Sequence, residues 1–146
     1  MRLRLLLVDE VPARRLAAAA ALSAHFDVLP LADGDDPVRS ARALTPDLAI
    51  ISLHPRKRSA SLRLVRILRT DVRPVGRVGV VDRAAERVPA DEVTGQWMAD
   101  GYFGGEPSPA ELTAFALAIA RGEHPVTDQP AAPVSATRRL LRRLRG

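Results

Sequence analysis

Four acidic residues at the ends of apolar segments are the strongest candidates for chemistry in this sequence: Asp9, Glu10, Asp82 and Glu106. Asp9 and Glu10 are adjacent, and a pair of carboxylates completed by water suits a hard divalent cation such as Mg²⁺. If all four carboxylates face one pocket, their repulsion raises the pKa of at least one of them or recruits a cation. The alternative is that Asp82 and Glu106 face solvent at the ends of loops. We expect no other cofactor.

Ser52 lies near the end of another apolar run, residues 48–53, and its type limits the reactions that this part of the chain can perform. A serine hydroxyl is a poor nucleophile unless an adjacent base takes its proton. His54 is an alternative phosphate acceptor, although a single loop histidine is more often solvated or hydrogen-bonded. Because the sequence shows neither a nucleophile–base pair nor a glycine-rich phosphate loop, we predict that the protein is not an enzyme. Metal-assisted chemistry at the acidic residues is the remaining enzymatic alternative.

Strands and helices that alternate along the chain must position these residues. Short apolar runs predict strands at residues 3–8, 26–31, 48–53, 78–81 and from 102 onward. Helix-forming residues predict helices at residues 14–24, 37–44, 59–69, 91–99 and 109–121. This alternation predicts an α/β fold with a five-stranded parallel sheet and helices on both faces. The carboxyl ends of such strands are where open sheets bind ligands.

Three segments together resemble the receiver domains of bacterial response regulators: residues 5–10, 46–55 and 99–107. The resemblance covers about residues 3–122 and implies a CheY-like receiver fold, which is flavodoxin-like, with the strand order 2-1-3-4-5. Receiver domains carry an acidic pair after the first strand and a phosphate-accepting aspartate after the third. A threonine or serine follows the fourth strand, and a lysine–proline pair follows the fifth. The resemblance also implies a role in two-component signal transduction.

This sequence departs from the receiver pattern at nearly every position that handles phosphate. The acidic pair is kept as Asp9 and Glu10, whereas the other positions hold Ser52 for the aspartate, Asp82 or Arg83 for the hydroxyl residue and Glu106 for the lysine. Pro55 follows Ser52 one residue sooner than in the pattern, so a shift that places Ile51 at the acceptor position stays open. Neither residue forms an acyl phosphate. The departures predict a pseudo-receiver, a signalling or scaffold module that works without phosphorylation.

Three of the five aromatic residues, Trp97, Tyr102 and Phe103, lie within seven positions. Aromatic side chains anchor many protein interfaces. In receiver domains the fourth helix, fifth strand and fifth helix form the usual dimerisation and output face, and the resemblance places these residues there. We therefore predict a partner surface at the three aromatic residues, for another signalling protein or for a second copy of the chain. The alternative is that Trp97 and Phe103 belong to the core, which the exposure of Trp97 decides.

Length and cysteine content divide the chain and suggest its surroundings. The 146 residues suit one domain of ordinary size with a short remainder. We predict a receiver-like domain at residues 1–122, a proline-rich linker at 123–136 and a basic tail at 137–146. The sequence contains no cysteine, which excludes disulfides and thiolate metal sites and favours a cytoplasmic location. We find neither a signal peptide nor an apolar run long enough to span a bilayer.

The basic tail combines arginines and leucines: Arg138, Arg139, Leu140, Leu141, Arg142, Arg143, Leu144 and Arg145. The leucines share one helical face and the arginines surround it, a pattern typical of segments that contact an acidic protein, an anionic membrane or nucleic acid. A solubilising terminus, or a segment that packs on its own domain, is the alternative. The rival function is a nucleic-acid-associated regulator that binds phosphates through this tail and the basic loop 56–58.

Overall fold

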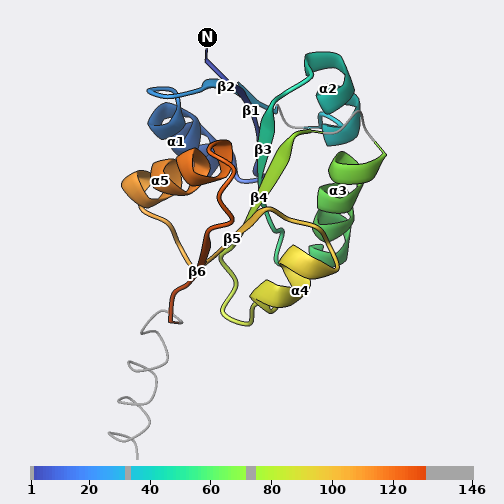
Figure 1. The fold of residues 1–146 in the computed structure, drawn as a ribbon, viewed down its shortest axis with the longest axis vertical. Coiled ribbons are helices and arrows are strands. Elements are labelled where there is room, and N and C mark those ends of the chain that lie inside the picture. Colours follow the sequence, from blue (N-terminus) through green and yellow to red (C-terminus); the bar gives the residue numbers. More distant parts are fainter. Residues whose placement is uncertain (1, 32–33, 72–74, 131–146) are drawn as a thin grey trace, which may run out of the picture.

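A six-stranded parallel sheet organises the computed structural model, which describes residues 2–31, 34–71 and 75–130 (Figure 1). Its strands are β1 (Arg4–Val8), β2 (Asp27–Pro30), β3 (Leu48–Ser52), β4 (Arg77–Asp82), β5 (Gly101–Gly104) and β6 (Val126–Asp128). They are ordered β2-β1-β3-β4-β5-β6, and every neighbouring pair is parallel. The predicted α/β class and the strand order 2-1-3-4-5 are confirmed, and one further strand extends the sheet beyond β5.

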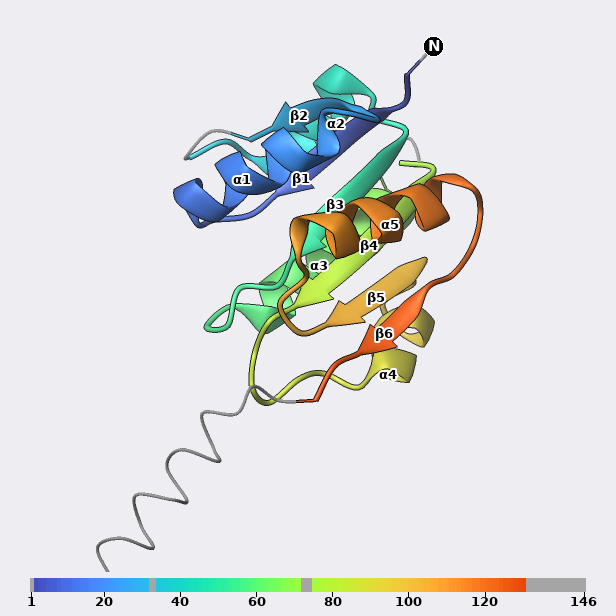
Figure 2. The same ribbon diagram turned by 90° about the vertical axis from the view of Figure 1, so that its left-hand side faces the viewer.

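The helices of the described residues cover both faces of this sheet. They are α1 (Pro12–Leu22), α2 (Pro37–Leu44), α3 (Arg58–Thr70), α4 (Ala90–Gly95) and α5 (Pro109–Ala120). Figures 1 and 2 show α1 and α5 on one face of the sheet, and α2, α3 and α4 on the other. The start of α5 is the predicted capping box, in which the side chains of Ser108 and Glu111 accept each other's backbone N–H groups. Within the described part of the chain, every helix is too short or too polar to cross a membrane.

Apolar side chains on both faces of the central strands form the core. Leu5 and Leu7 of β1 pack in the cluster under α1 and α5, whereas Leu6 packs in the cluster under α2, α3 and α4. Strands that are buried on both faces appear in a sequence as continuous apolar runs, which made β1 and β3 predictable. The register pairs Leu7 with Ile50 and Ser52 with Val81. The strands β1, β3 and β4 therefore end at the same edge of the sheet.

The strand β6 lies inside the stretch predicted as a linker, residues 123–136. The backbone N–H of Tyr102 donates to the carbonyl of Pro125 (2.9 Å), and the N–H of Gln129 donates to the carbonyl of Gly104 (2.8 Å). Prolines at both ends concealed this strand, because proline is typical both of extended linkers and of edge strands. β6 covers the edge of β5 (Figure 2). Residues 131–136 of the predicted linker and the whole basic tail lie outside the described residues.

Candidate functional site

The carboxyl ends of three neighbouring strands bring Asp9, Ser52 and Arg83 together at one edge of the sheet. Asp9 directly follows β1, Ser52 ends β3 and Arg83 directly follows β4. Glu106 reaches the same place from the loop between β5 and α5. We call these four residues the Arg83 pocket. Asp9, Ser52 and Glu106 were predicted from the sequence as site residues. The residue between them, Arg83, was named there only as one candidate for the position that holds threonine or serine in receivers.

Arg83 fills the centre of the pocket, and its side chain is only 13% exposed. Its Nη1 donates a hydrogen bond to Oγ of Ser52 (2.7 Å) and lies 3.7 Å from Oδ2 of Asp9. Its Nε lies 2.8 Å from Oε2 of Glu106. Burial lowers the pKa of the Arg83 guanidinium, and the positive charge of Arg14 adds to this, yet an arginine stays charged at neutral pH. A buried cation therefore bridges the serine and two carboxylates.

Asp9 is buried and fully engaged, with 1% of its side chain exposed. Arg14 donates from Nε to Oδ2 (2.6 Å) and from Nη2 to Oδ1 (2.9 Å), and the N–H of Val11 donates to Oδ1 (3.0 Å). Burial by itself raises the pKa of Asp9. The hydrogen bonds from Arg14 and Val11, with the charges of Arg14 and Arg83, outweigh burial and hold that pKa below its ordinary value. The Asp9 carboxylate is therefore ionised at neutral pH and already satisfied.

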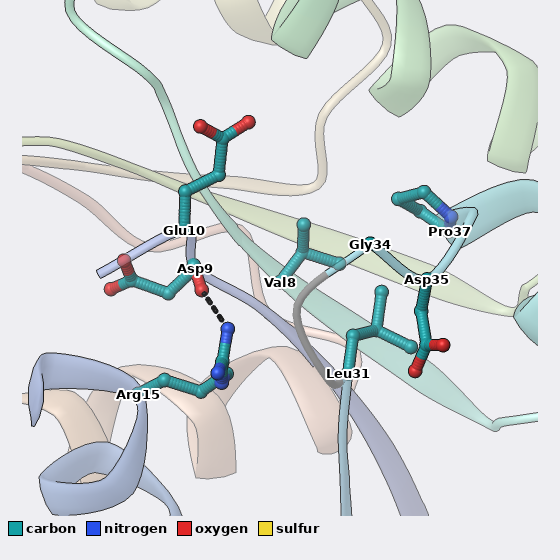
Figure 3. A pocket seen from close by; sticks show the side chains of 8 residues that line it. All are labelled: Val8, Asp9, Glu10, Arg15, Leu31, Gly34, Asp35 and Pro37. Atoms are coloured by element: carbon teal, nitrogen blue, oxygen red, sulfur yellow. Dashed lines mark hydrogen bonds between the residues drawn. The ribbon is translucent and has the colours of Figure 1, made fainter. Parts of the chain in front are cut away.

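Glu10 does not join Asp9 in a two-carboxylate site. Figure 3 shows the two side chains at the edge of a cavity of about 350 Å³, with their carboxylates pointing in different directions. The Glu10 side chain is 59% exposed, and its Oε2 lies 3.1 Å from Nε2 of His54. Nδ1 of His54 accepts a hydrogen bond from the backbone N–H of Arg56 (3.1 Å). The ring hydrogen is therefore on Nε2, which faces Glu10 as a donor. His54 is therefore a hydrogen-bonded loop residue.

These contacts do not fit the Mg²⁺ site predicted at Asp9 and Glu10. Arginine donors take up the oxygens of Asp9, and Glu10 is turned toward His54. Across residues 2–31, 34–71 and 75–130, no group of three or more His, Cys, Asp or Glu side chains is placed to hold a metal ion. We therefore derive no chemistry of the site from a bound cation.

Asp82 is buried at the end of β4, but it serves its own loop and not the pocket. Its Oδ1 accepts the N–H of Ala84 and its Oδ2 accepts the N–H of Val88, both at 3.1 Å. These bonds shape the loop 83–89 and so position Arg83. The predicted cluster of four unbalanced carboxylates does not form, because Asp82 turns away and arginines neutralise Asp9. The solvent-facing alternative holds for Glu106, which is exposed, and fails for Asp82.

The sequence did not identify Arg14 and Arg83 as the residues that bind the carboxylates. Arg14 lies in the first turn of α1, five residues after Asp9, and Arg83 directly follows β4. The usable signal was the burial expected for Asp9, because a buried carboxylate needs a cation or several N–H donors beside it. With 22 lysine and arginine residues in the chain, that signal did not single out these two.

The predicted partner residues Tyr102 and Phe103 are buried in this structure, so they belong to the core and not to a contact surface. The Tyr102 hydroxyl donates to the carbonyl of Val88 (3.1 Å), and burial raises the pKa of Tyr102 to about 12, with the charges of Asp82 and Asp128 adding to the effect. Phe103 of β5 packs edge-to-face against Phe115 of α5. Helices cover both faces of β5 and β6 covers its edge, which explains this burial.

Trp97 is partly buried and packs against the core cluster under α2, α3 and α4. Much of the Trp97 side chain therefore belongs to the core, which was the alternative to a partner surface.

The sequence matches no family model and no curated protein. A response regulator from Thermotoga maritima is 21% identical over 83% of this chain and 99% of its own, with a TM-score of 0.65. A response regulator protein from Burkholderia multivorans is 21% identical over 82% of this chain and 96% of its own, with a TM-score of 0.61. The isolated REC domain of RcsB from Salmonella enterica serovar Typhimurium, in the presence of phosphomimetic BeF3-, is 14% identical over 86% of this chain and 94% of its own, with a TM-score of 0.67.

The fold is that of a receiver domain. Solved structures with this similarity are consistently receiver domains of response regulators, and they cover 83–86% of this chain. At these low identities the structural similarity establishes the receiver fold alone, and the chemistry of this chain follows from its own side chains.

Proposed function

We propose that this protein is a phosphorylation-independent signalling module of the receiver fold, a pseudo-receiver that acts through protein contacts. The observation that supports this is the Arg83 guanidinium, which is bonded to Ser52 and paired with Asp9 and Glu106. Phosphoryl transfer to a carboxylate needs that carboxylate as nucleophile, a divalent cation and further positive charge to neutralise the phosphoryl oxygens. Here the two candidates for the nucleophile position, Ser52 and Ile51, carry no carboxylate, and the Arg83 side chain is bonded to Ser52.

Ser52 has no base that would turn its hydroxyl into a nucleophile within the described residues. The Asp9 carboxylate, which also contacts Arg83, has a lowered pKa and is held by Arg14, so it is a weak base at neutral pH. The carboxylate of Glu106 is paired with Arg83. We therefore propose a binding module and not an enzyme.

The loop that carries Arg83 is fastened at several points, which supports a single output state. Val88 receives a bond from the Tyr102 hydroxyl and donates its N–H to Asp82. Arg87 forms an ion pair with Asp128 of β6 at 2.6 Å. These contacts connect the Arg83 pocket to the outer edge of the sheet. We propose that a partner protein binds this one fixed arrangement.

The face over α4 and β6 is the best candidate for the partner surface. Val126 of β6 is 57% exposed, and Met98, just after α4, is 39% exposed. Both line a hollow of about 440 Å³. Met98 also has a φ of 65°, a left-handed conformation that costs a non-glycine residue about 1–2 kcal/mol. We propose that another signalling protein, or a second copy of the chain, contacts these two residues.

One experiment tests the loss of phosphorylation. Acetyl phosphate, or beryllofluoride with Mg²⁺, is added to the ¹⁵N-labelled full chain, and the amide NMR spectrum is compared before and after. We expect no shift at Asp9, Ser52 or Arg83, while a phosphorylatable receiver in the same buffer responds. Shifts that concentrate at these three amides would refute the proposal.

A second experiment tests the partner surface. Val126→Asp places a charge in the proposed surface, and Leu16→Asp places one on α1, where Leu16 is even more exposed. We expect Val126→Asp to abolish self-association in sedimentation velocity, or binding to a partner purified by affinity capture, and Leu16→Asp to preserve it. Equal effects of the two substitutions would contradict the assignment.

A further inference from the structure

A groove of about 300 Å³ lies between α2 and α3, next to Ser52. It opens outside the carboxyl ends of β1 and β3, between which the strand order changes direction, and open α/β sheets bind ligands at such a point. Apolar side chains form most of its lining: Val8, Pro37, Val38, Ile51, Ala60, Leu64 and Ile67. The groove is at the small end of the usual size of ligand sites, about 300–1,000 Å³.

The polar groups in the groove offer donors to a ligand. The oxygen of Ser52 accepts from Arg83, and the oxygen of Ser61 accepts the backbone N–H of His54 at 3.2 Å. Among the described residues, neither hydroxyl hydrogen has an acceptor. Lys57, the one lysine of the sequence, also lines the groove and is exposed. Two hydroxyl donors and an ammonium group are therefore free to bind an acceptor.

The acidic groups of the groove, in contrast, are already engaged. Oε2 of Glu10 lies 3.1 Å from Nε2 of His54 and faces its N–H group. Asp36 caps α2 and accepts the N–H of Val38 at 3.0 Å. Lys57 lies between two further cations of the basic loop 56–58. The capacity that remains in the groove favours a negatively charged ligand over a cation.

We propose that this groove binds a small carboxylic acid with a branched or aromatic apolar body. The carboxylate accepts from Ser52, Ser61 and Lys57, and the apolar body lies against Leu64 and Ile67. At the ~30 Å³ that one water molecule occupies in the liquid, the groove holds roughly ten non-hydrogen atoms. Because the Ser52 hydroxyl also accepts a hydrogen bond from Arg83, this single group connects the bound ligand to the centre of the Arg83 pocket. Lys57 of the basic loop 56–58 is thus given a role that it lacks in the proposed function.

The single lysine makes the test direct. Reductive methylation with ¹³C-formaldehyde labels Lys57 and the N-terminal amine of the full chain and keeps the charge of the lysine. Phenylacetate and isovalerate are titrated, and phenylacetamide and phenethylammonium serve as the neutral and cationic matches of phenylacetate. We expect a saturable shift of the dimethyl-Lys57 signal with the two acids. The amide and the amine should bind at least about tenfold more weakly, as expected when a charge-assisted hydrogen bond is lost.

Three substitutions locate the binding. Ala60→Leu fills the groove and should abolish the shift, whereas Ser61→Ala removes one donor and should weaken binding about tenfold. Arg56→Gln removes a neighbouring charge that does not line the groove, and binding should stay within about twofold. No saturable shift, equal binding of the amide, or a shift that survives Ala60→Leu would overturn the proposal. This test is independent of the proposed function, because beryllofluoride shifts would refute that function without changing the titration.

Discussion

The contact between Asp9 and Arg14 allows a demanding test of how the site is held together. Two hydrogen bonds, of 2.6 and 2.9 Å, join the guanidinium of Arg14 to the carboxylate of Asp9. The Asp9 side chain is 1% exposed and the Arg14 side chain is 31% exposed. Arg14→Gln keeps a polar side chain on α1 but removes the positive charge and the two-pronged geometry. The substitution therefore leaves the Asp9 carboxylate buried with a weaker set of partners.

The size of the effect follows from burial. Removing one partner of a fully buried ion pair costs about 3–5 kcal/mol, because an uncompensated charge remains. Water already weakens this pair, since Arg14 is about one-third exposed, and Arg83 stays 3.7 Å from Oδ2 of Asp9 to compensate in part. We expect Arg14→Gln to lower the free energy of unfolding by about 2 kcal/mol at neutral pH.

The effect depends on pH in a defined direction. The folded-state pKa of Asp9 lies below its ordinary value, so the pair stabilises the protein above the pKa of the unfolded carboxyl, about 3.9. That stability is lost as the pH falls through the folded pKa. In Arg14→Gln the hydrogen bonds and charge that oppose burial are lost, so the pKa of Asp9 rises. Protonation of Asp9 in acid then removes the unpaired buried charge, and the difference in stability between wild type and variant shrinks as the pH falls.

Urea unfolding followed by circular dichroism measures these quantities. The wild type, Arg14→Gln, Asp9→Asn and the double variant form a cycle, and Arg63→Gln on the exposed side of α3 serves as the control for loss of an arginine. We expect the cost of Arg14→Gln to fall by at least about half when Asp9 is already asparagine. The same cost in both backgrounds, with no difference between neutral and acid pH, would refute the reasoning.

Three further outcomes are expected. Tyr102→Phe removes the bond to the Val88 carbonyl and should lower the free energy of unfolding by about 1 kcal/mol in urea titrations, and the wild-type phenol should ionise only near pH 12 in absorbance titrations. Gly104→Ala places a methyl group 2.6 Å from Oδ1 of Asp128, so amide hydrogen exchange in β6 should rise while that in β1 stays unchanged. If the basic tail binds nucleic acid, its removal should abolish binding to duplex DNA. In anisotropy titrations, added salt should steeply lower the affinity of the full chain for the DNA.

The sequence predicted the strands well because parallel strands are buried on both faces. Residues 48–51 are an uninterrupted apolar run for this reason, and the helix start at Ser108 was visible as a capping box. The resemblance to receivers then supplied the strand order, which periodicity does not contain. β6 was missed because a three-residue edge strand next to Pro125 has too few residues to show a period of two.

The partners of the site residues were harder to predict. In the structure Asp9 directly follows β1, Ser52 ends β3 and Glu106 lies in the loop after β5. A sequence does not show which way these side chains turn. Asp82 follows the same apolar pattern as Asp9, yet one carboxylate bonds to its own loop and the other to arginines. That choice depends on loop geometry over residues 83–89, which is set by long-range contacts. The roles predicted for the linker beyond residue 130 and for the tail 137–146 remain predictions.

The extra strand also decides where the chain leaves the domain. Helix α5 runs against the strand direction, so a chain that ended its fold there would depart at the amino-terminal edge of the sheet, far from Ser52. β6 reverses this course and delivers Gln129 to the carboxyl edge, where its side-chain amide donates to Glu111 (2.9 Å). Sixteen residues follow residue 130. The chain therefore leaves the described residues at the carboxyl edge of the sheet, which is also the edge at which Ser52 and Arg83 lie.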